Sequence, residues 1–258
     1  MGRVEKFTLS VEPQGESPRK IWVYLPNSYD STKKKYDVLY MFDGHNLFFD
    51  ETATYGKCWG MKKYLDETGL DLVVVGQDCN HTGSKRMDEY CPLPAERLWG
   101  EKPIYAEGDV TAEWFVNVLK KECEKRYRIY KSRKHVGIGG SSMGGLMAQY
   151  MIAEYNDVYS KAACVSPAQY FCITSLTECI KEADCDDNTR IYMDLGSKER
   201  RSDAELVYAM DQIQELCHLF EEKGCHTWPH LVKGGTHSEE SWEKIIPLFL
   251  QFLYPELY

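Results

Sequence analysis

The stretch that decides the fold is His135-Val-Gly-Ile-Gly-Gly-Ser-Ser-Met-Gly-Gly-Leu146. It contains the pattern Gly140-x-Ser142-x-Gly144, which chance alone would place in about one chain in ten of this size. Its context makes the pattern more informative. An apolar segment that favours a strand precedes it, and Leu146–Tyr155, which favours a helix, follows it. The sequence therefore predicts a strand, a tight turn at Ser142 and a helix.

A serine on such a turn is typical of a nucleophile elbow. The turn strains the backbone of the serine and exposes its Oγ, and glycines two residues away let the strand and the helix pass closely. We therefore predict that Ser142 is a nucleophile. A dinucleotide loop starting at Gly137 would need glycine at position 142, and no Lys-Ser/Thr pair follows for a phosphate loop. A glycine turn that serves packing alone is the remaining alternative.

The rest of the chain alternates between strand-like and helix-like segments. The expected strands are Val4–Val11, Lys20–Leu25, Tyr36–Phe42, Leu70–Val75, His135–Ile138, Lys161–Ser166, Arg190–Leu195 and Thr227–Val232. The expected helices are Trp59–Thr68, Asp109–Arg126, Leu146–Tyr155, Ser202–Lys223 and Ser238–Leu253, the last with a kink or restart at Pro247. This order predicts one α/β domain over residues 1–258, with a mostly parallel sheet, helices on both faces and an antiparallel N-terminal edge.

Charge and composition exclude several classes of protein. The 258 residues include 31 Lys and Arg against 40 Asp and Glu, a net charge of −9 that repels nucleic acid. No apolar run approaches the ~20 residues that a membrane span needs, and Met1–Ser10 lacks the apolar core of a signal peptide. The ten cysteines form no C-x-x-C pair, which favours reduced thiols in a cytoplasmic protein. An exported protein with some disulfides is the alternative.

A serine nucleophile needs a base, and in this motif class the histidine comes last in the chain. His237, in Gly234-Gly-Thr-His237, follows the last predicted strand and is our expected base. His218 falls within a predicted helix. His226 and His230 have a spacing that would suit a metal only on a helix, and the proline between them argues against one.

The acid that orients the base should follow the strand Arg190–Leu195. Asp194 lies within that strand and comes too early, while Asp203 suits the first turn of the following helix. Glu199, in the turn between them, is the expected acid, and Asp203 stays open as an alternative.

An oxyanion hole needs two backbone N–H groups. The first is expected from Met143, directly after the nucleophile. The second is expected from the loop after Tyr36–Phe42, where Asp43-Gly44 can turn the N–H of His45 inward. A plain turn at Asp43-Gly44 is the alternative.

The irregular stretch Asn80–Gly108 is too long for a simple connection, and it leaves the carboxyl end of a strand. We expect it to form a rim or lid over Ser142, with Arg86, Tyr90 and Trp99 binding substrate. A purely structural pair between Arg86 and Glu89 is an equally weighted alternative.

The chain resembles the esterase D-like, putative esterase family of the α/β-hydrolase superfamily. The resemblance spans residues 36–253. It is carried by Leu39-Tyr-Met-Phe-Asp-Gly-His-Asn-Leu-Phe48, Arg86-Met-Asp-Glu-Tyr-Cys-Pro92, Gly140–Gly145, and Gly234-Gly-Thr-His237 with Trp242 after it. Many relatives have His-Gly where this chain has Asp43-Gly44, and Asp is more usual than Glu199.

The resemblance implies an α/β-hydrolase fold and a serine esterase that acts through an acyl-enzyme, without metal or cofactor, on a small-molecule ester. The family includes feruloyl and acetyl esterases and S-formylglutathione hydrolases, so short-chain acyl, sugar and hydroxycinnamoyl esters are the expected substrates. An acyltransferase or thioesterase with the same triad, and a non-catalytic binding module, are the alternatives. The sequence does not give the oligomeric state.

Overall fold

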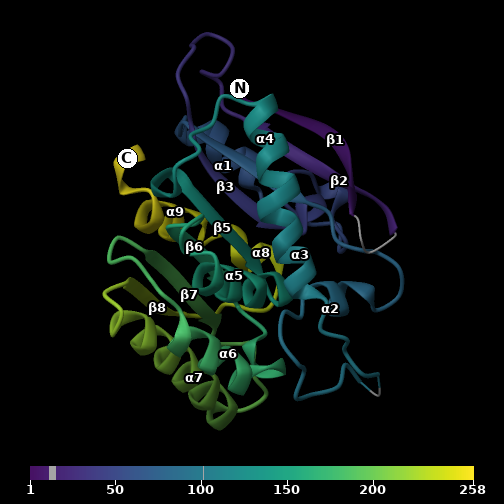
Figure 1. Ribbon diagram of the computed structural model, residues 1–258, viewed down its shortest axis with the longest axis vertical. Helices are drawn as coiled ribbons and strands as arrows, with labels where there is room; N and C mark the ends of the chain where they lie inside the picture. Colours follow the sequence, from purple (N-terminus) through teal and green to yellow (C-terminus); the bar gives the residue numbers. More distant parts are fainter. Residues whose placement is uncertain (12–15, 101) are drawn as a thin grey trace.

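The computed structural model describes residues 1–11, 16–100 and 102–258. Within these residues eight strands form one sheet in the order β1-β2-β4-β3-β5-β6-β7-β8 (Figure 1). The strands from β4 to β8 run parallel, and β1 and β2 pair antiparallel at the N-terminal edge. The predicted α/β fold class, with its antiparallel edge, is therefore confirmed.

The strands follow the expected segments closely. Their bounds are β1 Arg3–Val11, β2 Glu16–Leu25, β3 Asp37–Phe42, β4 Leu72–Gln77, β5 Val136–Ser141, β6 Lys161–Val165, β7 Arg190–Gly196 and β8 His226–Val232. Pro229 is accommodated because β8 is an edge strand that pairs only with β7.

The near-continuous apolar sequence of β3 reflects a sheet that is covered on both faces. Val38, Tyr40 and Phe42 belong to one buried cluster, and Leu39 and Met41 belong to another on the opposite face. The same alternation runs along β4. Since both faces are buried, all positions of these two strands other than the terminal Asp37 and Gln77 are apolar or glycine, which is the pattern of a central parallel strand.

The helices fall into two layers on either side of the sheet (Figure 1). The helices packed into the first cluster are α2 Lys85–Glu89, α3 Gly108–Trp114, α4 Lys120–Arg126, α5 Met143–Glu154, α6 Ile173–Glu182 and α7 Asp203–Glu221. Those packed into the second are α1 Met61–Thr68, α8 Glu239–Glu243 and α9 Ile246–Leu253.

Several boundaries differ from the sequence-based expectations. β4 begins and ends two residues later than predicted, and α5 begins at Met143 rather than Leu146. The expected helix from 109 to 126 is interrupted by a π-helical turn, Phe115–Leu119, between α3 and α4. The helices α2 and α6 were not predicted. The expected restart at Pro247 is confirmed, because α8 ends at Glu243 and α9 begins at Ile246.

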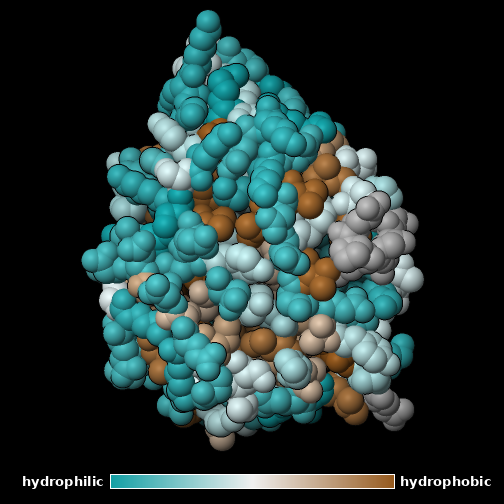
Figure 2. Space-filling view, viewed as in Figure 1, coloured by the Kyte–Doolittle hydropathy of each residue, from teal (hydrophilic) through white to brown (hydrophobic). Residues whose placement is uncertain are grey.

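No helix within the described residues is both long and apolar enough to cross a membrane. Hydrophilic side chains cover most of the face shown in Figure 2, and apolar ones lie there in small separate groups. That face therefore offers no large apolar patch of the kind that marks an interaction surface.

The glycines around Ser142 are needed for packing. A Cβ at Gly140 would lie 2.8 Å from the backbone carbonyl atoms of Gly144, and one at Gly144 would lie 2.9 Å from Cβ of Phe42. At Gly145 the added atom would lie 2.8 Å from the carbonyl oxygen of Val165. These glycines therefore set how closely α5 approaches β3, β5 and β6.

Gly140→Ala should destabilise the protein by about 1–3 kcal/mol, because the new methyl group meets the backbone of α5, which cannot move aside cheaply. Its neighbour Gly139→Ala is the matched comparison and should lose less, since the Cβ there would lie 3.1 Å from Ala163 Cβ and 3.3 Å from the Ala163 carbonyl oxygen, contacts that a shift of a few tenths of an ångström would relieve. Urea denaturation of both variants measures the difference. Equal loss in the two variants would contradict the packing argument.

Candidate active site

The candidate site lies at the carboxyl ends of the parallel strands, and backbone strain is concentrated there. Three non-glycine residues in the described chain have positive φ: Asp43 at 55°, Ser142 at 56° and Ser166 at 43°. Each of them directly follows the last residue of a strand: Asp43 follows β3, Ser142 follows β5 and Ser166 follows β6, and these three strands are neighbours in the sheet. Such conformations cost free energy and cluster at functional sites.

Ser142 stands between β5 and α5 with φ 56° and ψ −120°. Its N–H donates to the carbonyl oxygen of Val165 at 3.0 Å, and its own carbonyl accepts from Ala168 and Leu146. These bonds hold the strained residue in place. Ser142 lines a pocket of about 360 Å³ that is also lined by His237, so the structure brings the expected nucleophile and base to one cavity.

Glu199 and His237 are in direct contact. Nδ1 of His237 lies 2.7 Å from Oε2 of Glu199. The other oxygen, Oε1, accepts hydrogen bonds from the Gly196 N–H and from Ser166 Oγ, both at 2.7 Å. The carboxylate is 1% exposed, whereas the His237 side chain is 44% exposed. A buried carboxylate is therefore bonded to one ring nitrogen of an accessible imidazole.

The electrostatics favour an ionised Glu199. Burial works to raise the pKa of this carboxyl group, but the hydrogen bonds from His237, Ser166 and Gly196 outweigh it and hold the pKa below its usual value. The carboxylate can thus accept a hydrogen bond from a protonated Nδ1 of His237. Nε2 of the same ring then has no proton and can act as a base in the cavity.

The other two acids considered in the sequence lie elsewhere. Asp203 is exposed in the first turn of α7, and the cap of that helix is Ser202, whose Oγ accepts from the Glu205 N–H. Asp194 is buried and accepts hydrogen bonds from the Ser166 N–H at 2.8 Å and the Tyr192 hydroxyl at 2.9 Å. Burial raises the pKa of Asp194 to about 7.

The two expected oxyanion donors differ in their surroundings. Met143 is the first residue of α5, where backbone N–H groups have no acceptor within the helix. The N–H of His45, in contrast, donates to Oδ1 of Asp78 at 3.2 Å. This differs from the expectation of a donor turned toward the nucleophile, because Asp78 already accepts from it.

Arg86, predicted to bind substrate, lines the pocket and is paired with Asp43. Its Nε and one terminal nitrogen donate to the two carboxylate oxygens of Asp43 at 2.8 and 2.6 Å. Burial would raise the pKa of Asp43, but the Arg86 guanidinium more than offsets this and lowers it. The alternative pairing with Glu89 is wrong, since Glu89 accepts from Arg19 and Gln77 instead.

The other two residues predicted to bind substrate do not line the pocket. Tyr90 is fully buried, and its hydroxyl donates to Gln77 Oε1 at 2.7 Å, so it cannot contact a ligand in the cavity. Trp99 is half exposed and packs beside Phe171, with ring centroids 6.3 Å apart. Of the predicted rim, Asn80, His81, Gly83 and Arg86 line the pocket. Glu101 lies outside the described residues.

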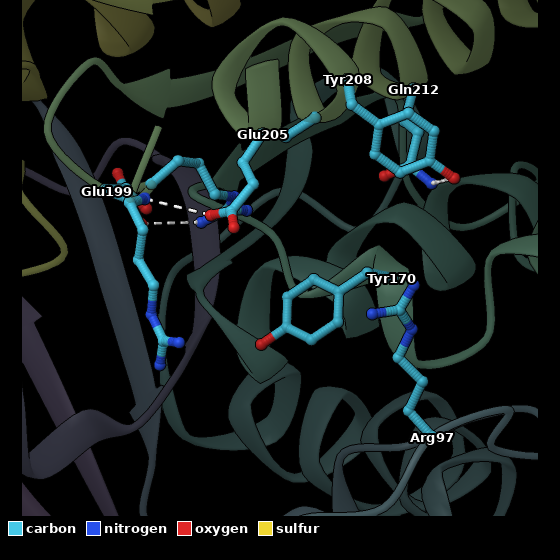
Figure 3. Close-up of a pocket in the computed structure, with 9 residues that line it drawn as sticks. Arg97, Tyr170, Glu199, Glu205, Tyr208 and Gln212 are labelled. Carbon is cyan, nitrogen blue, oxygen red and sulfur yellow. Dashed lines mark hydrogen bonds between the residues drawn. The ribbon is translucent and has the colours of Figure 1, made fainter. Parts of the chain in front are cut away.

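A second pocket, of about 490 Å³, lies beside Glu199 (Figure 3). The guanidinium groups of Arg97 and Arg200 lie 6.0 and 5.9 Å from the ring centroid of Tyr170. Arg201 and Glu205 also line it. This pocket therefore places two guanidinium groups around one aromatic ring next to Glu199.

Sequence reasoning missed Ser166 as a part of the site, and it named Trp242 only as one of the residues that carry the family resemblance. Ser166 Oγ donates to Glu199 and accepts from the Trp242 indole N–H at 3.1 Å. The ring of Trp242 packs edge-on against His237 at 5.2 Å. The only signal was position, since Ser166 ends a predicted strand. Serine and tryptophan at such positions are too common to identify from one sequence.

Comparisons with known proteins identify the family of the chain and similar folds. A family profile described as putative esterase matches residues 13–252. The uncharacterized protein YbbA of Bacillus subtilis (strain 168) is 23% identical over 260 residues, covering 96% of this chain and 97% of the relative.

Two solved structures are similar in fold. The BES protein from Bacillus cereus has a TM-score of 0.70 at 17% identity, covering 97% of this chain and 94% of the other. The S-formylglutathione hydrolase from Agrobacterium tumefaciens has a TM-score of 0.68 at 14% identity, covering 100% and 96%. At such low identity the likeness shows the fold alone.

Arg86→Met should destabilise the protein by about 3–5 kcal/mol, because it leaves the buried Asp43 carboxylate without its partner. The double variant Arg86→Met/Asp43→Asn should lose less than the sum of the single losses, and asparagine tolerates the left-handed backbone there. Chemical denaturation of all three variants measures this coupling. Unchanged stability of Arg86→Met with reduced kcat/KM would restore Arg86 as a substrate-binding residue.

Asp194 should make stability depend on pH. Its raised pKa means that the native state keeps a proton that the unfolded chain loses near pH ~3.9. This contribution to stability is complete below that pH and is lost as the pH rises to about 7. Between these two pH values, the free energy of unfolding of the wild type should therefore fall by more than about 1 kcal/mol relative to that of Asp194→Asn. The exposed control Asp211→Asn should follow the wild type. Parallel curves for wild type and Asp194→Asn would contradict the assignment.

Proposed function

Because the chain belongs to the putative esterase family, we propose that it hydrolyses carboxylic esters with Ser142 as nucleophile, His237 as base and Glu199 as the orienting acid. The observation that carries the proposal is the 2.7 Å contact between His237 and the buried Glu199, at a pocket that also exposes Ser142. Nucleophile, acid and base follow one another along the chain as Ser142, Glu199 and His237, which is the order that nucleophile-elbow enzymes use.

The first half of the reaction forms an acyl-enzyme. His237 Nε2 takes the proton from Ser142 Oγ as the oxygen attacks the ester carbonyl carbon. Glu199 accepts the hydrogen bond from Nδ1 and stabilises the imidazolium. The carbon–oxygen bond to the alcohol then breaks, and the alcohol leaves with the proton from Nε2.

The second half repeats these steps with water. His237 takes a proton from water, the hydroxyl oxygen attacks the acyl carbon, and Ser142 leaves and recovers its proton as the acid is released. We propose the N–H of Met143 as one donor to the oxyanion and that of His45 as the second. His45 can serve only once the bond from its N–H to Asp78 has been exchanged for one to the substrate.

The pocket supports a small ester as substrate. Its volume of about 360 Å³ suits an acyl group or a single ring. The second pocket, with Arg97, Arg200 and Tyr170, is a candidate for a hydroxyl-rich or aromatic part of the molecule. Short-chain acyl, sugar and hydroxycinnamoyl esters therefore form the first panel to test. Thioesters belong in it as well, since one structural neighbour is an S-formylglutathione hydrolase.

Ser142→Ala and His237→Ala should each lower kcat for p-nitrophenyl acetate by 10⁴-fold or more, as roughly expected for residues that act as a unit. Both variants should keep the circular dichroism spectrum and thermal midpoint of the wild type within a few degrees. Retention of more than about a tenth of the wild-type kcat in either variant would be incompatible with the triad.

Glu199→Gln should lower kcat by at least about a hundredfold, because the amide no longer fixes the tautomer and charge of His237. Asp203→Asn is the matched control and should leave kcat unchanged, with a loss of stability of about 1 kcal/mol or less from the first turn of α7. Steady-state kinetics of both variants decide between the two acids. Loss of activity in Asp203→Asn alone would reverse the assignment.

A further inference from the structure

We propose that His45, Cys79 and His81 form a binding site for a zinc-like divalent cation on the wall of the pocket that contains Ser142. The three residues are brought together by the sheet. β3 and β4 are parallel neighbours with Phe42 opposite Gln77, so the segments that follow them leave the same edge side by side. His45 comes from the first segment, and Cys79 and His81 come from the second.

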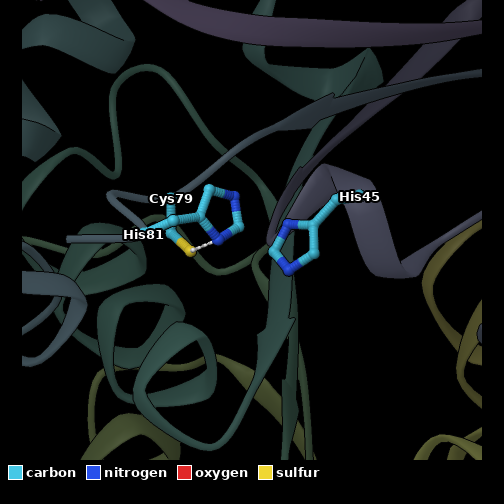
Figure 4. Close-up of side chains that lie close together, drawn as sticks. All are labelled: His45, Cys79 and His81. Atoms are coloured by element: carbon cyan, nitrogen blue, oxygen red, sulfur yellow. Dashed lines mark hydrogen bonds between the residues drawn. The ribbon is translucent and has the colours of Figure 1, made fainter. Parts of the chain in front are cut away.

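The potential ligand atoms are already close together. One ligand atom from each of the three residues lies within 4.8 Å of the others, and Cys79 Sγ is 4.0 Å from His81 Nδ1. Figure 4 shows the imidazole of His45 facing Cys79 and His81 from the opposite side. A cation between them would require only a small contraction to reach ordinary zinc–sulfur and zinc–nitrogen distances of about 2.0–2.3 Å.

The His45 ring has a buried nitrogen that the protein leaves unsatisfied. Its side chain is 7% exposed, and Nδ1 has no hydrogen-bond partner among the residues that the structure describes, although Asp78 Oδ1 approaches it to 2.6 Å outside the direction of a hydrogen bond. The other nitrogen, Nε2, is 3.0 Å from Thr54 Oγ1. A second hydrogen-bonded partner of this kind orients metal-bound histidines.

The chemistry of the surrounding groups favours a cation. The same Asp78 oxygen lies 3.8 Å from His81 Nε2, so one carboxylate faces both imidazoles and is available as a further ligand. Two imidazoles and a thiolate are ligands that zinc prefers, and three protein ligands leave a position open for exchange. His45 and Cys79 are buried while His81 is exposed, which gives the ion a route from solvent.

This site differs from the proposed catalytic triad. It lies beyond β3 and β4, whereas Glu199 and His237 follow β7 and β8. The three residues line the same pocket as Ser142 and His237, so a bound ion would add positive charge to the wall beside Ser142. The inference does not depend on ester hydrolysis, because binding is measured without substrate.

The test is a titration of reduced, tag-free, metal-free protein with Co²⁺, followed by displacement with Zn²⁺ in competition with a chromophoric chelator. We expect one equivalent of Co²⁺ to give the intense visible bands of a tetrahedral site and a thiolate charge-transfer band. Zinc should abolish both, with a dissociation constant in the micromolar range or tighter.

Cys79→Ser and His81→Gln should each weaken zinc binding at least about tenfold, and Cys79→Ser should also remove the charge-transfer band. His81 is exposed, so its variant keeps the test valid if Cys79→Ser fails to fold. Cys179→Ser and His218→Gln are the matched controls and should bind like the wild type. Absence of stoichiometric binding, or equal weakening in the control variants, would overturn the proposal.

Discussion

The close approach of β5 and α5 at Ser142 is the constraint on which the rest of the site depends. A backbone with φ 56° and ψ −120° is costly for serine, and it persists because the glycines on either side allow α5 to pack directly on the sheet. That packing aims the start of α5, with the Met143 N–H, at the carboxyl edge. Ser142 is also hydrogen-bonded through its backbone to Val165 and Ala168. Because these two residues flank Ser166, the position of Ser142 helps to fix the position of Ser166.

The second principle of the site is that each buried carboxylate has its own set of donors. Asp43 is held by Arg86, Glu199 by His237, Ser166 and Gly196, and Asp194 by Ser166 and Tyr192. Ser166 serves two of them, through its N–H and its hydroxyl. Glu199 therefore stays ionised, with its pKa lowered, while Asp194, which lacks a cationic partner, has a raised pKa.

How much of the structure could be predicted depended on how far apart in the sequence the interacting residues lie. The elbow and the central strands depend on local sequence patterns, and both were predicted. Glu199 and His237 were proposed from chain order, and the contact between them supports that proposal. The helix α6 was not predicted because its two isoleucines and two threonines are weak helix formers, and the packing of Leu176 and Ile180 into the core stabilises it. The predicted strand Leu70–Val75 stops before Gly76. In the structure Gly76 belongs to β4, and a Cβ there would lie 2.6 Å from Gly44 Cα, a long-range contact that the local pattern does not indicate.

The side-chain assignments in the rim failed for a different reason. Arg86 and Asp43 are 43 residues apart, and their pairing depends on how α2 lies against the end of β3. The composition of the rim is polar and aromatic, as in a binding loop, but Tyr90 is used to fill the core beside Phe42. A single sequence does not distinguish an aromatic residue that faces a ligand from one that faces the core.

The central claim is that Ser142 carries the acyl group during turnover. The most direct measurement is intact-mass and peptide mass spectrometry of the protein after reaction with a serine-directed fluorophosphonate and, separately, after rapid acid quenching with p-nitrophenyl acetate. We predict one adduct per chain in each case, located on Ser142 and absent from Ser142→Ala. A stoichiometric adduct on another residue, or turnover of the ester with no adduct on Ser142, would contradict the account.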